Sequence, residues 1–345
     1  MDTRVPPFCG FLICFLVEYS GSYFSHERTL SIKSNHKSAN TFMLFLLSYN
    51  SLLIFAIASL YWNFWHGTDS FAAGLINSHW FLPVGQLLGF LLPMAVFGSL
   101  LRGVEEREGI APTPIKKKPL GLINIVLIIA ISLIIQPLVM LVSGLTSLFF
   151  PNPASALLSD LVALPIPLAL AILALTPAIC EELVFRGFIQ ARYEAQPMVY
   201  TALVNGLFFG IIHLNLHQFG YAFLMGIVFA YMVYFTQSIY SAILSHFVIN
   251  ASQFFLAYLN AAQLYGSPER AELWEAIVEL GRLSLFILPL IVLLFYLFVW
   301  HNRQKNPVSE TAIETAIETA KPPHPFDISF WAVLLLYVLL ALFVL

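Results

Sequence analysis

Charged residues are scarce in this chain of 345 residues, because aspartate, glutamate, lysine and arginine make up only 10% of it. A typical soluble domain is about one quarter charged. So few charges cannot cover a water-exposed surface, which excludes a soluble enzyme and a charge-rich disordered chain. The 16 basic and 19 acidic residues give a net charge of −3, which excludes nucleic acid as a partner held through a basic surface.

Cysteine is also rare. Cys9, Cys14 and Cys180 are too few and too scattered for a disulfide framework or a Cys-x-x-Cys metal site. Hydrophobic residues, in contrast, make up 59% of the chain. This composition indicates an integral membrane protein that is surrounded by lipid.

Long apolar runs support this interpretation, since a transmembrane helix needs about 20 mostly apolar residues. We predict an all-α polytopic transmembrane bundle of eight to nine spans. The sixth run and the last two are short enough to be tilted or re-entrant. The runs lie at roughly 42–65, 80–101, 119–142, 161–190, 198–218, 219–236, 238–259, 283–300 and 328–345.

A shorter apolar stretch at residues 8–17 is too brief to cross a membrane. Glu18 ends it and no good small-residue cleavage site follows, which disfavours a signal peptide. Two interpretations stay open: the stretch lies at the membrane surface, or translation begins at Met43.

The basic residues predict the orientation. With the N-terminus inside, the inner segments hold fourteen lysines and arginines, whereas the outer loops hold only Arg270 and Arg282. Basic residues are enriched in cytoplasmic loops. We therefore expect a cytoplasmic N-terminus and, in a bacterium, a plasma-membrane location.

The runs and the polar segments between them divide the chain into four parts. The last part combines an amphipathic external helix at 267–280, two further spans and a polar linker at 301–327. The parts are a cytosolic tail at 1–41, N-terminal transmembrane helices at 42–160, a motif-bearing core of four helices at 161–260, and a C-terminal part at 261–345.

Ionisable residues inside spans are the most informative ones, because each costs several kcal/mol unless it is paired or hydrated. Few occur here. They are Glu181, Glu182 and Arg186 in the fourth run, His213 and His217 in the fifth, and His246, followed by Asn250, in the seventh.

The fourth run predicts one helix that continues to about Arg192, with a kink at Pro177. Glu182 and Arg186 are four residues apart on one face, so they can form an ion pair. Glu181 points about 100° away and stays free. A free carboxylate in a low dielectric binds its proton more tightly, as a general base requires. The alternative is a helix end with an ion pair at the cytosolic surface.

The histidines show the same four-residue spacing. Phe209 and His213 share a helix face, as do His213 and His217, and His246 shares one with Asn250. A core histidine bonded to a backbone carbonyl is the alternative for His213, and His217 is expected at the interface. Counted along ideal helices from the inner ends of their spans, Glu181 lies about 16 Å deep, His246 about 12 Å and His213 about 22 Å. Helix tilt can bring these three residues together.

Three motifs resemble those of a known family. EELVFRG at 181–187 is similar to the EExxxR motif of the CPBP family, also called Abi, which includes CAAX proteases and bacteriocin-processing enzymes. Phe209 with His213 resembles its FxxxH motif, and His246 with Asn250 resembles its HxxxN motif. The similar region covers roughly 165–257.

The resemblance implies an intramembrane, glutamate-dependent endopeptidase. Its type II prenyl branch removes the last three residues of CAAX substrates, and bacterial members process peptides or confer bacteriocin immunity. The substrate would therefore be a peptide or a lipidated protein.

The resemblance also implies residue roles. Glu181 would activate water with help from His213, whereas His246 and Asn250 would bind the scissile carbonyl and stabilise its oxyanion. Glu182 and Arg186 would position the site. Members are often called metalloproteases, so Glu181, His213 and His246 would be the ligands of a divalent metal such as zinc. The chain has no HExxH motif, and a metal-free mechanism is equally open.

Two other functions compete with a protease. One is a non-catalytic immunity or scaffold protein that binds a peptide. The other is a proton-coupled transporter, although the chain shows no convincing internal duplication of the kind many transporters have. A rhomboid-like serine protease is disfavoured because a Gly-x-Ser-x-Gly segment is missing.

Overall fold

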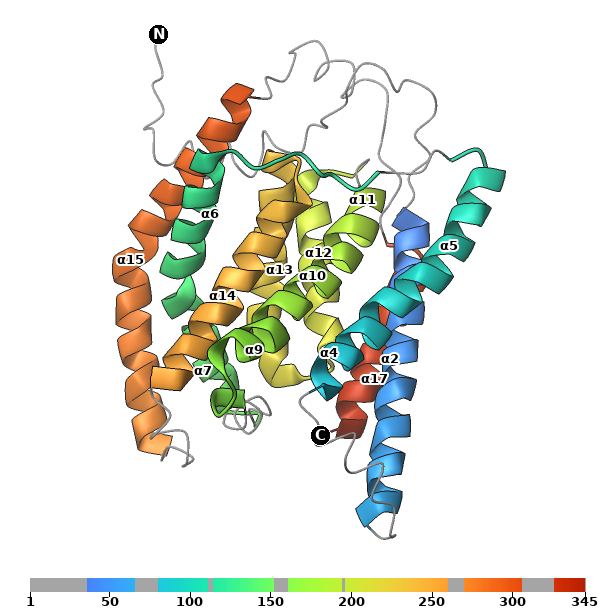
Figure 1. Ribbon diagram of the computed structural model, residues 1–345, viewed down its shortest axis with the longest axis horizontal. Coiled ribbons are helices and arrows are strands. Elements are labelled where there is room, and N and C mark those ends of the chain that lie inside the picture. Colours follow the sequence, from blue (N-terminus) through green and yellow to red (C-terminus); the bar gives the residue numbers. More distant parts are fainter. Residues whose placement is uncertain are drawn as a thin grey trace.

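A computed structural model describes residues 36–65, 80–110, 114–151, 161–193, 196–259, 270–305 and 326–344. Within these residues the protein is all-helical and has no strand. Seven helices are long and apolar enough to cross a membrane, and two apolar helices are shorter. The chain is therefore an integral membrane protein, arranged as a helical bundle (Figure 1).

Several of the spans are built from consecutive helical segments. Short π-helical segments (η2, η3 and η4) interrupt the second and fourth spans. The elements are α2 (His36–Trp65), α4 (Phe81–Gln86), η2 (Leu87–Leu91), α5 (Leu92–Arg107), α6 (Leu122–Ile134), α7 (Gln136–Ser147), α9 (Ile166–Leu170), η3 (Ala171–Leu175), α10 (Thr176–Glu182), η4 (Leu183–Ile189), α11 (Gln190–Arg192), α12 (Met198–Ile212), α13 (Leu216–Thr236), α14 (Ile239–Leu259), α15 (Arg270–Lys305) and α17 (Ile328–Val344).

Each predicted apolar run corresponds to a helix, but the boundary between the fifth and sixth runs was misplaced. Helix α12 ends at Ile212, and Leu214 adopts a left-handed conformation with φ of 51°. Asn215 then caps α13, because its side chain accepts hydrogen bonds from the backbone N–H groups of His217 (2.8 Å) and Gln218 (3.2 Å). The sixth span is therefore long, and the fifth helix is the short one.

The segment predicted as an external amphipathic helix joins the following span. Together they form α15, one continuous helix of 36 residues with Pro289 inside it. At 1.5 Å per residue this helix is about 54 Å long, which exceeds the thickness of a hydrocarbon core. The predictions for residues 8–17, and most of those for the polar linker, lie outside the described residues.

Glycines allow α12 and α13 to pack closely. A Cβ atom on Gly206 would lie 2.7 Å from the carbonyl oxygen of Phe223, and one on Gly226 would lie 2.7 Å from the Cα of Gly206. Such small residues let helix backbones approach within a membrane. The resulting hairpin brings Phe209, on α12, and Phe229, on α13, to within 6.2 Å between ring centroids.

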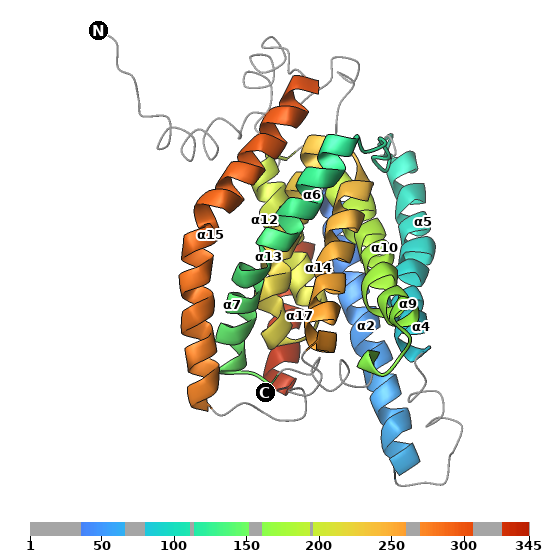
Figure 2. The same cartoon turned by 60° about the vertical axis from the view of Figure 1, so that its left-hand side comes forward.

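The two ends of the bundle differ in charge. We call one the basic end: it holds the C-terminal ends of α5, α11 and α15 and the segment 114–121 (Figures 1 and 2). This segment is held there by hydrogen bonds from Ile239 N to Lys116 O (2.8 Å) and from Lys118 N to Gln237 O (3.4 Å). We call the other the far end: it holds the starts of α4 and α9, the α12–α13 turn and the end of α14.

A buried ion pair fixes the fourth span at the basic end. Arg192 donates to both carboxylate oxygens of Glu105, from Nε at 2.8 Å and from an η nitrogen at 2.9 Å. Its guanidinium also lies 3.5 Å from the centre of the Phe188 ring. Because both partners are buried, this two-point contact anchors the helix that carries the glutamate pair to α5.

Candidate active site

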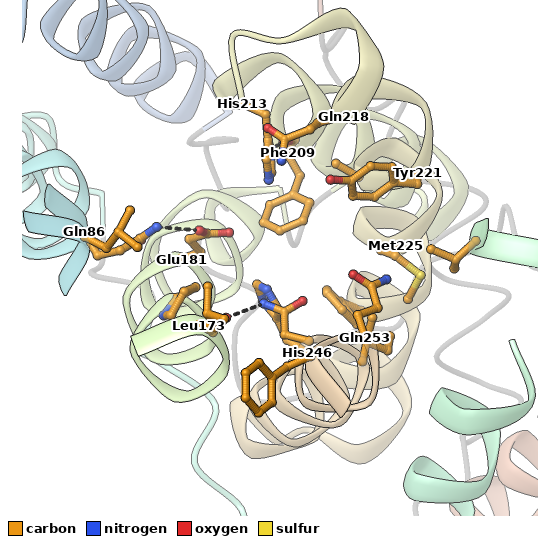
Figure 3. Close-up of a pocket in the computed structure, with 18 of the residues that line it drawn as sticks. Gln86, Leu173, Glu181, Phe209, His213, Gln218, Tyr221, Met225, His246 and Gln253 are labelled. Carbon is orange, nitrogen blue, oxygen red and sulfur yellow. Dashed lines mark hydrogen bonds between the residues drawn. The ribbon is translucent and has the colours of Figure 1, made fainter. Parts of the chain in front are cut away.

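A cavity of about 380 Å³ lies among α4, α7, η3, α10, α12, α13 and α14 (Figure 3). Most of its wall is apolar. Four of the six predicted site residues line it, namely Glu181, His213, His246 and Asn250, together with Gln86, Gln218, Tyr221 and Gln253. Glu182 and Arg186 are not in the lining.

The fourth span is locally adapted to hold this site. Pro177 has no N–H group to donate to the carbonyl of Leu173, four residues earlier. Asn250 fills that position, because its Nδ2 donates to Leu173 O at 3.1 Å. Thr176 Oγ1 donates to Ala171 O at 2.8 Å within the π-helical turn. The predicted proline irregularity therefore couples α14 to the helix that carries Glu181.

Glu181 is buried, with 5% of its surface exposed, and its side chain faces the cavity (Figure 3). Its Oε1 accepts a hydrogen bond from Gln86 Nε2 at 3.1 Å. None of the ion pairs in the described part of the chain includes Glu181. Its carboxylate is thus held by a neutral amide rather than by a cation.

Glu182 has a different environment although it is the next residue. It is completely buried and forms the expected ion pair with Arg186, whose Nη1 lies 3.1 Å from each carboxylate oxygen. Arg186 also donates to Gly226 O at 3.0 Å and stacks over Phe209, 4.6 Å from the ring centre. The burial of both side chains rules out the alternative of an ion pair at the cytosolic surface.

His246 connects the two environments. Its Nδ1 lies 2.9 Å from Oε1 of Glu182. A carboxylate accepts only, so we assign the proton to Nδ1, which leaves Nε2 for the cavity. The ring stacks on Phe229 with 5.3 Å between centroids. Glu182 therefore sets the orientation of a cavity-lining histidine, a contact that the spacing within one helix could not reveal.

His213 lies in the turn after α12, and its Nδ1 is 2.7 Å from Phe209 O. A carbonyl oxygen accepts, so this ring also carries its proton on Nδ1. His213 therefore bonds to a backbone carbonyl, as the alternative interpretation predicted, and it also lines the cavity. Figure 3 shows Glu181, His213, Tyr221 and His246 around one common space.

His217 is the second residue of α13, so it does not share a helix with His213, which follows α12. It is buried, and Thr146 Oγ1 donates to its carbonyl oxygen at 3.0 Å. Its ring nitrogens lie 3.4 Å from the hydroxyls of Ser143 and Thr146. The predicted helix face shared by His213 and His217 is wrong because Asn215 caps a new helix, and an asparagine before an apolar run is a known N-cap signal.

The divalent metal implied by the resemblance would need a group of residues that could hold it. Among the described residues, no group of three or more histidine, cysteine, aspartate or glutamate side chains is placed to hold a metal ion. Glu181, His213 and His246 line the same cavity without meeting that arrangement. We therefore derive no step that uses a metal.

Four polar lining residues escaped the sequence analysis: Gln86, Gln218, Tyr221 and Gln253. Gln253 continues the spacing of His246 and Asn250 along α14, so the extended face was a usable signal. Gln86 is a single amide in an otherwise apolar run. Nothing in the sequence links it to Glu181, which is 95 residues away.

Comparison with known proteins agrees with the motifs. Neither a curated protein nor a solved structure matches the chain. The family model described as "Type II CAAX prenyl endopeptidase Rce1-like" matches residues 163–252, which include all three motifs. This match confirms the predicted family, and such membership implies an intramembrane protease. Residues 163–252 are thus a domain of the Rce1-like type II CAAX prenyl endopeptidase (CPBP) family.

Proposed function

We propose that this protein hydrolyses a peptide bond of a membrane-associated substrate, with water activated by Glu181. One observation carries the proposal. The Glu181 carboxylate is buried, has no cationic partner among the described residues, and faces a cavity lined by two histidines. A buried acid of this kind is costly in an apolar bundle and is typical of a functional site.

In this mechanism Glu181 takes a proton from a water molecule in the cavity, and the resulting hydroxide attacks the scissile carbonyl carbon. The protonated Glu181 then gives that proton to the leaving amine, so the carboxylate is regenerated. His213 orients the water, because its Nδ1–H is used by Phe209 O and its Nε2 remains an acceptor.

His246 and Asn250 stabilise the oxyanion of the tetrahedral intermediate. Asn250 uses one N–H of its amide for Leu173 O, which leaves the second N–H for the substrate. In this role His246 acts as an imidazolium, which donates from Nε2 to the oxyanion while the carboxylate of Glu182 holds its Nδ1–H. Glu182 and Arg186 act as positioning residues.

The cavity lining also favours the substrate class. Apolar side chains form most of the wall, and no lysine or arginine is among the lining residues. A largely apolar peptide segment or a lipidated protein suits such a wall. For the chain itself we propose a cytoplasmic N-terminus, in the plasma membrane if the host is bacterial, because the basic residues gather at one end of the bundle.

The test compares membrane peptides in cells that express the wild type or Glu181→Gln. We expect cleavage products to disappear with Glu181→Gln and to persist with the control Glu279→Gln, because Glu279 is exposed and pairs with Arg282. Undiminished cleavage by Glu181→Gln would remove the proposed base. A phenotype that survives Glu181→Ala would instead favour a non-catalytic peptide-binding protein.

A further inference from the structure

Helix α14 carries both proposed oxyanion donors, His246 and Asn250, and it is held from two sides. It lies between α6 and the fourth span (Figures 1 and 2). On the side of the fourth span, Asn250 bonds to Leu173 O, and His246 bonds to Glu182. On the side of α6, the helix is held by residues that the proposed mechanism does not use.

These residues form a polar seam, which consists of Ser132 and Gln136 facing Ser245, Ile249 and Ser252 of α14. Gln136 Nε2 donates to Ser252 Oγ at 2.7 Å and also lies 3.4 Å from the carbonyl oxygen of Ile249. Ser252 Oγ in turn donates to that carbonyl at 2.8 Å. The Oγ atoms of Ser132 and Ser245 are 2.7 Å apart. The seam therefore fixes α14 at two points that are about two helical turns apart.

The seam and the oxyanion donors lie on neighbouring faces of α14. The seam residues of this helix are spaced by four and then by three residues, so they share one face. The residue after each of them lines the cavity, about 100° further around the helix. These residues are His246, Asn250 and Gln253. A rotation of α14 that breaks the seam would therefore move both oxyanion donors within the cavity.

Stability alone does not account for a glutamine at position 136. The Gln136 side chain is buried, and its Oε1 has no hydrogen-bond partner among the described residues. A buried carbonyl oxygen without a partner lowers the stability of a folded protein. An apolar side chain of similar size would avoid this cost.

We propose that Gln136 is a positioning residue for the hydrolysis: its amide fixes the rotation of α14 and thereby places His246 and Asn250 at the oxyanion. The contact lies directly behind the cavity wall, because Ile249, whose carbonyl oxygen faces Gln136, lines the cavity. Gln136 precedes residues 163–252, so the site depends on a residue outside the family domain. This inference rests on the proposed function, since it concerns the oxyanion donors of that site.

Cleavage kinetics of full-length variants in liposomes test the inference, with kcat expressed per folded protein. The probe is a synthetic fluorogenic peptide that spans a bond which the wild type cleaves and Glu181→Gln does not. Gln136→Leu removes the amide and nearly keeps the volume of the side chain. We expect kcat to fall about tenfold at constant KM, which is less than the loss of about 10²–10³-fold on removal of a whole oxyanion donor.

Ser252→Ala removes the other partner of the same hydrogen bond, so it should lower kcat in the same way. The double variant Gln136→Leu/Ser252→Ala should then be no slower than the slower single variant, because both substitutions act through one contact. Asn124→Leu is the matched structural control. Asn124 is also buried on α6, but it exchanges two hydrogen bonds of 2.9 Å with Asn302 on α15 rather than with α14. It should leave kcat and KM unchanged even where it lowers the unfolding temperature.

A wild-type kcat in Gln136→Leu, a change confined to KM, or an equal fall of kcat in Asn124→Leu would overturn the inference. Effects of Gln136→Leu and Ser252→Ala that multiply in the double variant would overturn it as well. If Gln136→Leu does not fold, as its size-exclusion profile would show, Ser252→Ala decides by the same criteria. Undiminished cleavage by Glu181→Gln refutes the proposed function, whereas undiminished cleavage by Gln136→Leu refutes only the positioning role, so the two failures are distinguishable.

Discussion

Two adjacent glutamates should differ in how the same substitution changes the stability of the protein. Glu181→Gln and Glu182→Gln each replace a carboxylate by an amide of nearly the same shape. Glu182 is completely buried and is the partner of both Arg186 and His246. Its neutralisation leaves a buried guanidinium without a counter-charge, which typically costs about 3–5 kcal/mol. That is a large part of the total stability of a folded protein, about 5–15 kcal/mol.

Glu181→Gln should leave stability unchanged or slightly increased, because it removes a buried charge that is held only by the amide of Gln86. Its effect should appear in catalysis. Loss of the proton acceptor is expected to lower kcat by about 10²–10⁴-fold. Glu182→Gln also disturbs His246, so it should lower both activity and stability.

Thermal unfolding in detergent and peptide cleavage in membranes measure the two quantities for each variant. The reasoning is refuted if Glu182→Gln unfolds at the wild-type temperature, because the buried ion pair would then be unimportant. It is equally refuted if Glu181→Gln unfolds much earlier than wild type and Glu182→Gln does not.

Three further substitutions test separate contacts. Asn250→Ala removes a proposed oxyanion donor, so kcat should fall about 10²–10³-fold. The lost hydrogen bond to the carbonyl of Leu173 should also lower the stability by about 1 kcal/mol. An unchanged kcat in cleavage kinetics would contradict the proposed role of Asn250. Gln86→Leu removes the hydrogen bond to the Glu181 carboxylate, which is worth about 1.5 kcal/mol. We therefore expect kcat to fall about tenfold at constant KM. A change in KM alone would argue against a role of Gln86 in positioning Glu181. Gly206→Ala forces a Cβ against the α13 backbone and should destabilise by about 1–3 kcal/mol. The control Gly103→Ala, where no atom lies within 4 Å, should stabilise by up to about 1 kcal/mol in the same unfolding assay.

The helices were largely predictable because the signal for a membrane span is local. An apolar run of sufficient length must form a helix in lipid, since no water is present to bond its backbone. The error at the fifth run has the same local origin. Apolarity continues through Leu214 and Leu216, so hydropathy alone does not register a turn that depends on one left-handed residue and the cap at Asn215.

The residues of the candidate site were largely predictable from the sequence, but their side-chain contacts were predictable only in part. The four-residue spacing of Glu182 and Arg186 defines a distance within one helix, and the ion pair is present. The contact between Glu182 and His246 joins residues 64 apart, and that between Gln86 and Glu181 joins residues 95 apart. Such distances depend on how helices cross, which local periodicity does not contain.

The amino-acid sequence alone determined that this protein lies in a membrane, which segments are helical, and which few polar side chains interrupt them, because hydropathy and helical spacing act over neighbouring residues. Tertiary structure alone decided that Glu182 also holds His246, that Gln86 holds Glu181, and which polar side chains line one cavity. The reason is physical: a side chain's partners in a bundle are set by the packing of other helices around it, and here glycine contacts and buried polar bonds between distant segments set that packing.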